Sequence, residues 1–232
     1  MRTFFLFFFI TFSPILAISF KNTDEMLAYV KSLLPKNPII LEAGAHFGED
    51  TIRMKAVWPN AVMHIFEPLP SSFEIMIQAT KHLTDVMCYP YALTITTGMT
   101  HFYIDVLNHG ASSINYPVEW NQHEFNKTPI EVPCITLHEW AQLNQIKKID
   151  FMWLDMEGHE LYALQNGLEL LRTVKVIYTE ISFVPVRENS CSYYDLKKFL
   201  LSHGFREIWK SGDSGRYADA LFVKKTNKRS YK

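Results

Sequence analysis

A short apolar run that ends in an acid and leads into two glycines constrains the fold of this chain most strongly. The run is Ile39–Leu41, the acid is Glu42, and Gly44 and Gly48 follow four residues apart. A segment compatible with a helix begins after Gly48, which gives the order strand, glycine turn and helix. Glycine lets the backbone approach a ligand where a Cβ atom would collide. The pattern therefore predicts the first half of a nucleoside-binding α/β unit.

A second acid stands where such units contact a ribose. The apolar run Ala61–Phe66 ends at Glu67, 19 residues after Gly48, and a carboxylate in this place accepts hydrogen bonds from ribose hydroxyls. The full G-x-G-x-x-G pattern of dinucleotide sites is absent, which favours a ligand without a pyrophosphate, such as S-adenosylmethionine. The alternative interpretation is a tight turn in any α/β protein.

Size and charge narrow the class of protein. The chain has 232 residues and a formal net charge of −1. We expect one domain with a sizeable core over residues 21–232. Without a basic surface, nothing in the composition indicates a nucleic-acid partner.

The N-terminus has the composition of a secretory leader. Arg2 precedes the apolar run Phe4–Ile10, and small residues follow at Ala17 and Ser19. A basic start, a short apolar run and an A-x-S site are typical of a signal peptide. An uncleaved membrane anchor is the alternative, although the run is short for a membrane span. We therefore expect residues 1–20 to export the protein or attach it to a membrane.

Apolar runs of strand type alternate with helical patterns along the rest of the chain. This alternation and a final pair of strands predict a mostly parallel sheet with an antiparallel edge. Residues 107–129 form the longest irregular segment, and such segments often serve as lids or substrate walls. Strands are expected at about 38–43, 61–66, 86–93, 101–106, 131–135, 149–154, 175–181, 205–210 and 218–224. Helices are expected at about 23–34, 48–57 and 192–202, after capping boxes at Ser71 and Thr136, and along the leucines of 161–171.

Acidic side chains crowd the turn after the apolar run Ile149–Leu154. Asp155 ends the predicted strand, and Glu157, His159 and Glu160 follow within one turn. Ligands of open α/β sheets bind at the carboxyl ends of strands, so this group could bind a divalent metal or act as a general base. The alternative is that the acids only complement the dipole of the helix that follows. For Glu160 alone we favour this helix-capping interpretation.

Taken together, these segments resemble the FkbM-type methyltransferases, a branch of the class I S-adenosylmethionine-dependent fold. The resemblance covers about residues 36–224. Its segments are Leu41–Thr51, Phe66–Pro68, Ala111–Ser113, Val132–Leu137, Ile149–Glu160, Tyr178–Ile181 and Ala220–Val223, with Leu164, Gly167 and Leu171. It implies a Rossmann-like, mostly parallel seven-stranded sheet with an antiparallel edge and helices on both faces. Its implied cofactor is S-adenosylmethionine, and its implied acceptor is a hydroxyl on a small molecule or sugar.

The resemblance also implies roles for particular residues. Glu42, Gly44 and Gly48 would line the methionine and ribose end of the cofactor, and Glu67 would bind the ribose. Asp155 and Glu157 would face the transfer site, and Asp155 or His159 would take the proton of a hydroxyl acceptor.

The chain departs from the family pattern at two positions, and rival functions stay open. The family usually has Asp where Glu42 stands and Asn where His46 stands. One alternative is another nucleotide-dependent enzyme, such as a dehydrogenase, and another is an exported binding domain without catalytic activity. The predicted leader conflicts with a cytosolic cofactor, so a cytoplasmic protein with an internal start is a further alternative.

Overall fold

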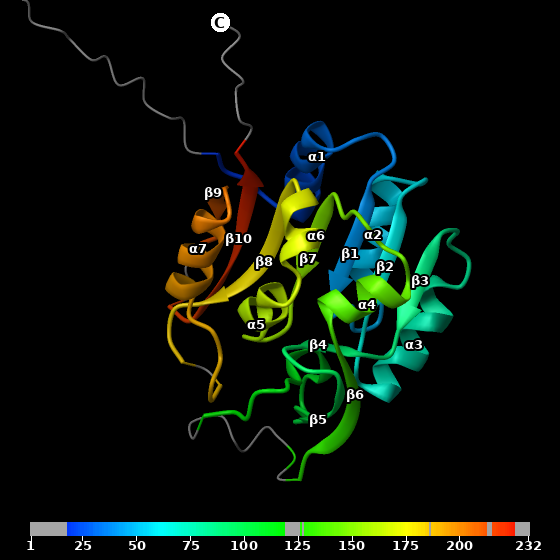
Figure 1. Cartoon of the computed structure of the whole chain (residues 1–232), viewed down its shortest axis with the longest axis vertical. Helices are drawn as coiled ribbons and strands as arrows, with labels where there is room; N and C mark the ends of the chain where they lie inside the picture. The colour runs from blue at the N-terminus through cyan, green and yellow to red at the C-terminus, as the bar shows by residue number, and fades with distance from the viewer. Residues whose placement is uncertain (1–17, 119–125, 127, 186, 213–214, 226–232) are drawn as a thin grey trace, which may run out of the picture.

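The computed structural model describes residues 18–118, 126, 128–185, 187–212 and 215–225. Seven of its strands form one sheet in the order β3-β2-β1-β7-β8-β10-β9 (Figure 1). Five neighbouring strands run parallel, and β10 is antiparallel to both β8 and β9. The predicted sheet with an antiparallel edge is confirmed. The strands are β1 Ile39–Ala43, β2 Val62–Phe66, β3 Val86–Tyr89, β7 Phe151–Leu154, β8 Val176–Ser182, β9 Phe205–Lys210 and β10 Tyr217–Lys224.

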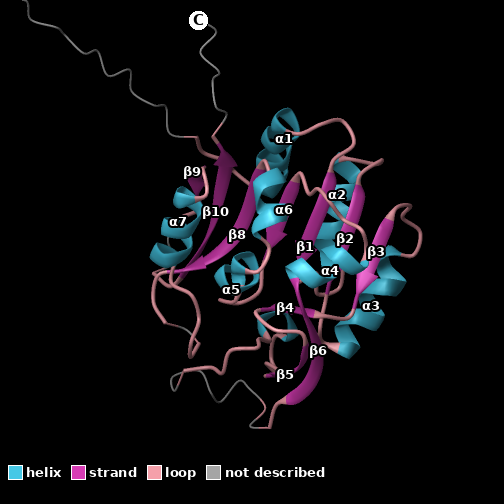
Figure 2. Ribbon diagram, viewed as in Figure 1, coloured by secondary structure: helices cyan, strands magenta, loops and turns pink. Residues whose placement is uncertain are grey.

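Helices cover both faces of this sheet, as Figure 2 shows. Successive side chains of a strand point to opposite faces, so Ile40 packs in one core cluster and Leu41 in the other. The cluster of Ile40 includes side chains of α1 Thr23–Leu33, α2 Glu49–Val57 and α3 Pro70–Thr80. The cluster of Leu41 includes side chains of α4 Leu137–Leu143, α5 Glu160–Gln165, α6 Leu168–Thr173 and α7 Tyr193–Ser202.

A second, three-stranded sheet lies below the carboxyl ends of the parallel strands in Figure 1. Its order is β4-β6-β5, with bounds Ala92–Thr94, Ile130–Thr136 and Gly98–Phe102. The prediction of one strand over 86–93 was wrong, because β3 stays in the main sheet while β4 pairs with β6. Pro90 lies at the break, and proline has no N–H to give to a sheet.

Two helical predictions also need correction. The helix expected along 161–171 is two helices, α5 and α6, with Gly167 between them. A Cβ on Gly167 would lie 2.2 Å from Cδ2 of Leu137 in α4, so the close packing of α4 requires glycine there. The capping box expected at Ser71 is absent, because α3 begins one residue earlier at Pro70, which is favoured at a first helical position. By contrast, Thr136 caps α4 as predicted, since its Oγ1 accepts the N–H of Glu139 at 3.1 Å.

Parts of two predicted segments lie outside the described residues. These are most of the leader, residues 1–17, and residues 119–125 and 127 of the irregular segment. Within the described part of the chain, every helix is too short or too polar to cross a membrane.

Candidate active site

A cavity lies between the carboxyl edge of the main sheet and the small sheet. About 530 Å³ of empty space lies between its walls and in the open solvent at its mouth. Its walls come from the ends of β1, β2 and β7, from β4 and β5, and from the short 3₁₀ helix η1, His109–Ala111. Four of the predicted site residues line it, namely Gly44, Glu67, Asp155 and His159. The structure thus brings these four together at the edge where α/β sheets bind ligands.

The turn after β1 requires glycine because it packs against the backbone that follows β7. Gly44 has a φ of +83°, and a Cβ there would lie only 1.7 Å from the backbone oxygen of Asp155. The N–H of Asp155 in turn donates to Ala43 at 2.9 Å, so β1 and β7 end side by side. Gly44 therefore lets Glu67 and Asp155, which follow the strands on either side of β1, approach one cavity.

Gly48 lies away from the cavity wall. It has a φ of +86° at the start of α2, and a Cβ there would lie 2.9 Å from Cγ2 of Thr80 in α3. It is not among the residues that line the cavity. Here the glycine serves the packing of α2 against α3, and a contact with the cofactor stays a prediction.

Glu67 holds the glycine turn in place. Its Oε2 accepts the N–H of His46 at 2.9 Å and its Oε1 accepts the N–H of Leu69 at 2.8 Å. The side chain is 6% exposed, and desolvation raises its pKa to about 7. Each carboxylate oxygen has more than one lone pair, so both can accept a further hydrogen bond from a ligand hydroxyl.

Glu42 is buried in β1 and contacts α2. It is 1% exposed, and its Oε2 accepts the hydroxyl of Thr51 at 2.5 Å. Desolvation raises its pKa to about 8. It does not line the cavity, so its direct contact with a cofactor stays a prediction.

Three carboxylates from two neighbouring strand ends meet beside the cavity. Asp155, Glu157 and Glu180 each place an oxygen within 4.8 Å of the others, a distance at which they could hold a divalent cation. Desolvation in this crowded turn, then the charges of Glu157 and Glu160, raise the pKa of Asp155 well above its ordinary range. The pKa of Glu157 rises to about 7, again through desolvation, although Arg187 opposes the rise. Desolvation, and then the charges of Glu157 and Asp155, raise the pKa of Glu180 to about 11.

Glu160 lies in the first turn of α5 and binds backbone N–H groups of the turn that precedes the helix. Its Oε1 accepts the N–H of Met156 at 2.8 Å and that of Gly158 at 3.3 Å. The side chain is buried and supports the turn that carries Asp155 and His159.

His159 is a buried imidazole that opens on the cavity. It is 9% exposed, and neither ring nitrogen has a hydrogen-bond partner among the described residues. Desolvation lowers its pKa to about 4, which keeps the ring neutral at pH 7. A neutral imidazole can donate from one nitrogen and accept at the other, so a ligand in the cavity could satisfy both.

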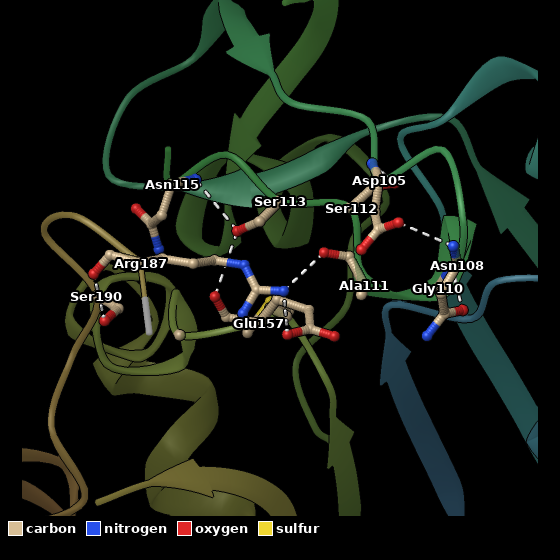
Figure 3. Close-up of polar contacts among 12 residues, drawn as sticks. Asp105, Asn108, Gly110, Ala111, Ser112, Ser113, Asn115, Glu157, Arg187 and Ser190 are labelled. Atoms are coloured by element: carbon tan, nitrogen blue, oxygen red, sulfur yellow. Dashed lines mark hydrogen bonds and ion pairs between the residues drawn. The ribbon is translucent and has the colours of Figure 1, made fainter. Parts of the chain in front are cut away.

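Sequence reasoning missed Arg187. Its Nη2 lies 2.6 Å from Oε2 of Glu157 and 2.6 Å from the backbone oxygen of Ala111, as Figure 3 shows. A single arginine with no motif around it carries no signal in the sequence. Its role comes from contacts with residues that are distant along the chain.

Comparison with known proteins identifies the family. Residues 42–207 match the methyltransferase FkbM domain, which is more than two thirds of the chain. The chain belongs to this family. A curated relative of this FkbM protein is the 2-O-methyltransferase NoeI of Sinorhizobium fredii (strain NBRC 101917 / NGR234), 27% identical over 164 residues, or 66% of this chain and 67% of the relative. The predictions of the family and of an S-adenosylmethionine-dependent methyltransferase are confirmed.

Solved structures with low sequence identity share the fold. Aeropyrum pernix fibrillarin, in complex with natively bound S-adenosyl-L-methionine, superposes with a TM-score of 0.50 at 12% identity, over 85% of this chain and 73% of that one. The precorrin-6y C5,15-methyltransferase of Geobacter metallireducens gives a TM-score of 0.50 at 10% identity, over 91% and 92%. At such identities the likeness concerns the fold alone. It confirms the predicted Rossmann-like architecture.

Proposed function

We propose that this FkbM protein transfers the methyl group of S-adenosylmethionine to a hydroxyl on a small molecule, a sugar or a lipid head group. The observation that carries the proposal is that Glu67, Asp155 and His159 all line the same cavity. The curated relative is a 2-O-methyltransferase, which supports oxygen as the acceptor atom.

The residues at the ends of β1 and β2 suit the cofactor. Gly44 keeps the backbone free of side-chain bulk at the cavity wall, and Glu67 offers carboxylate oxygens for hydroxyl donors. Phe66 and Pro68 add apolar surface on either side of Glu67. When bound, S-adenosylmethionine supplies a methyl group on a positively charged sulfur.

Asp155 is the best candidate to take the proton of the acceptor hydroxyl. Its carboxylate opens on the cavity, where an ionised oxygen can accept a proton from a bound hydroxyl. His159 is already neutral, but its low pKa makes it a weak base. We assign His159 to orienting the acceptor and Asp155 to accepting the proton. The remaining catalytic effect is positioning, which can contribute several kcal/mol.

An assay of methyl transfer tests this function. The full chain would be incubated with S-adenosylmethionine labelled on its methyl group and with a panel of hydroxylated sugars and lipid head groups. We expect label in at least one acceptor, and parallel reactions with EDTA or added Mg²⁺ would report any use of the three clustered carboxylates. If the chain binds the cofactor but labels none of the panel, the hydroxyl acceptor is wrong. A chain that fails to bind the cofactor would instead be a binding domain without catalytic activity.

For location, we propose that residues 1–20 direct the protein out of the cytosol or to a membrane. Arg2, the Phe4–Ile10 run and the small residues Ala17 and Ser19 support this. Attachment to the inner face of a membrane would leave the enzyme in contact with cytosolic S-adenosylmethionine.

A further inference from the structure

One wall of the cavity is a segment with little regular structure of its own. Residues 109–117 contain only the short helix η1, yet they contribute His109, Gly110, Ser112 and Ile114 to the lining. A wall of this kind needs support from elsewhere, because a short irregular segment opens readily.

Arg187 supplies that support from the loop between β8 and α7. Its Nη2 bridges the backbone oxygen of Ala111 in the segment and Oε2 of Glu157 in the acidic turn, at 2.6 Å each (Figure 3). The Arg187 side chain is 2% exposed, so water does not compete for these contacts. Charge-assisted hydrogen bonds of this length are among the stronger ones in proteins.

Backbone contacts also connect the β8–α7 loop to residues 109–117. Arg187 pairs with Pro117 in an isolated antiparallel bridge, and the N–H of Glu188 donates to Tyr116 at 2.7 Å. On the other side, the hydroxyl of Ser113 donates to the backbone oxygen of Glu157 at 3.2 Å. The segment is therefore fixed to both the β8–α7 loop and the acidic turn.

The acidic turn also packs closely against the β8–α7 loop at Gly158. A Cβ on Gly158, the residue after Glu157, would lie 2.5 Å from Cβ of Ser190. The hydroxyl of Ser190 donates to the backbone oxygen of Arg187 at 2.9 Å. The loop that carries Arg187 is thus packed directly on the turn that carries Asp155 and Glu157.

We infer that Arg187 is a positioning residue, which clamps residues 109–117 onto the acidic turn and so shapes the cavity without lining it. This inference rests on the proposed function and adds to it a residue that controls the cavity wall formed by residues 109–117. The clamp depends on the length of the arginine side chain as well as on its charge, because Nη2 reaches both acceptors at once.

Replacing Arg187 by lysine tests the clamp with little loss of charge compensation. A lysine ends one bond short of Nη2 and carries a point charge in place of the guanidinium plane. Arg187→Lys should therefore keep Glu157 partly neutralised while it releases Ala111. Arg53→Lys is the matched control, because Arg53 forms an ion pair of the same 2.6 Å length with Asp50 but is far more exposed.

Two measurements on the full chain decide the matter. The first is hydrogen–deuterium exchange of peptides from 105–117 without ligand, and the second is calorimetric binding of S-adenosylhomocysteine. For Arg187→Lys we expect local exchange to rise about tenfold or more and the dissociation constant to rise about tenfold, with little change elsewhere in the chain. Arg53→Lys should change neither quantity.

Other results would overturn the inference in recognisable ways. Unchanged exchange over 105–117 in Arg187→Lys would show that Arg187 does not clamp the segment. A uniform rise in exchange along the whole chain would assign Arg187 to general stability. The exchange measurement needs no ligand, so a failure of the unmutated chain to bind S-adenosylhomocysteine would count against the proposed function and leave the clamp standing.

Discussion

Oε2 of Glu67, at the end of the second strand, accepts the backbone N–H of His46 at 2.9 Å. The acid that the sequence assigns to the ribose thus also holds the turn that follows the first strand. His46 has a φ of +47°, a conformation that non-glycine residues adopt rarely. The hydrogen bond fixes it beside the cavity that both residues line.

We expect Glu67→Ala to weaken S-adenosylmethionine binding through lost hydrogen bonds to the ribose. One or two charge-assisted hydrogen bonds are worth roughly 1.5–3 kcal/mol each, so the dissociation constant should rise at least about tenfold. Calorimetry measures the effect, and thermal unfolding reports any damage to the turn at His46. Glu74→Ala, which removes an exposed carboxylate of α3, is the control and should bind normally. Equal affinity in the Glu67 and Glu74 variants would remove Glu67 from the site.

Asp155→Asn should reduce turnover far more than it reduces cofactor binding. The change keeps the size of the side chain but removes the negative charge that accepts a proton. We expect turnover to fall on the order of a hundredfold or more, and His159→Ala to have a smaller effect. Initial rates with the acceptor found in the panel would measure both. If Asp155→Asn keeps near-normal turnover, this turn is a helix cap, and the base must be sought in residues 107–129.

Ionisation of Glu42 should destabilise the folded protein as the pH rises. Its pKa is about 8 when folded against an ordinary 4.5, so the folded chain holds a proton that the unfolded chain has already released. Stability from this group is complete below about pH 4.5 and is lost as the pH rises through 8. His64 and His159 act in the opposite direction, but only below about pH 6.5, because burial lowers their pKa values to about 4.

Glu42→Gln isolates this effect, since a glutamine oxygen can still accept the Thr51 hydroxyl. Relative to the unmutated chain, the variant should gain on the order of 3 kcal/mol of unfolding free energy between pH 5 and pH 8. Urea unfolding at the two pH values gives the difference. A constant difference between the two proteins would mean that Glu42 does not titrate in this range.

Gly48→Ala should lower stability by about 1–2 kcal/mol, because alanine resists the positive φ and its Cβ would press on Thr80. Thr80→Ser removes the methyl group that the new Cβ would meet, so the double variant should recover part of the loss. Chemical denaturation of the single and double variants measures this coupling. Weak cofactor binding with normal stability in Gly48→Ala would instead support the ligand contact that the sequence suggested.

A reporter protein fused after Phe20 should be found outside the cytosol or on a membrane. The basis is the leader pattern of residues 1–20. Cell fractionation and sequencing of the reporter's N-terminus would follow its location and cleavage. A soluble cytosolic reporter with an intact N-terminus would refute the leader.

Much of the fold could be predicted because local patterns agree with the global arrangement. Buried runs such as Phe151–Leu154 and Val176–Ser182 are parallel strands, and Asp155 after the first run meets Glu180 near the end of the second. The errors arose where a distant contact decided the local structure. Gly167 divides a helix because Leu137 of α4 packs against it, and β4 leaves the main sheet to pair with β6.

The site was predicted only as far as the strand ends define it. Glu67 and Asp155 follow apolar runs directly, and His159 lies in the turn after Asp155, so their meeting at one cavity follows from parallel topology. Arg187 bonds Ala111 across 76 positions of sequence, and nothing in the local sequence indicates that contact. Gly48 shows the opposite case, in which a motif residue has a packing role that the motif does not reveal.

The most direct test of the account is a calorimetric titration of S-adenosylmethionine into the unmutated full chain. We predict saturable binding at one site, with a dissociation constant between about 1 μM and 1 mM, and competition by S-adenosylhomocysteine. The absence of saturable binding under conditions where the protein is folded would contradict the central claim that this chain is a working methyltransferase.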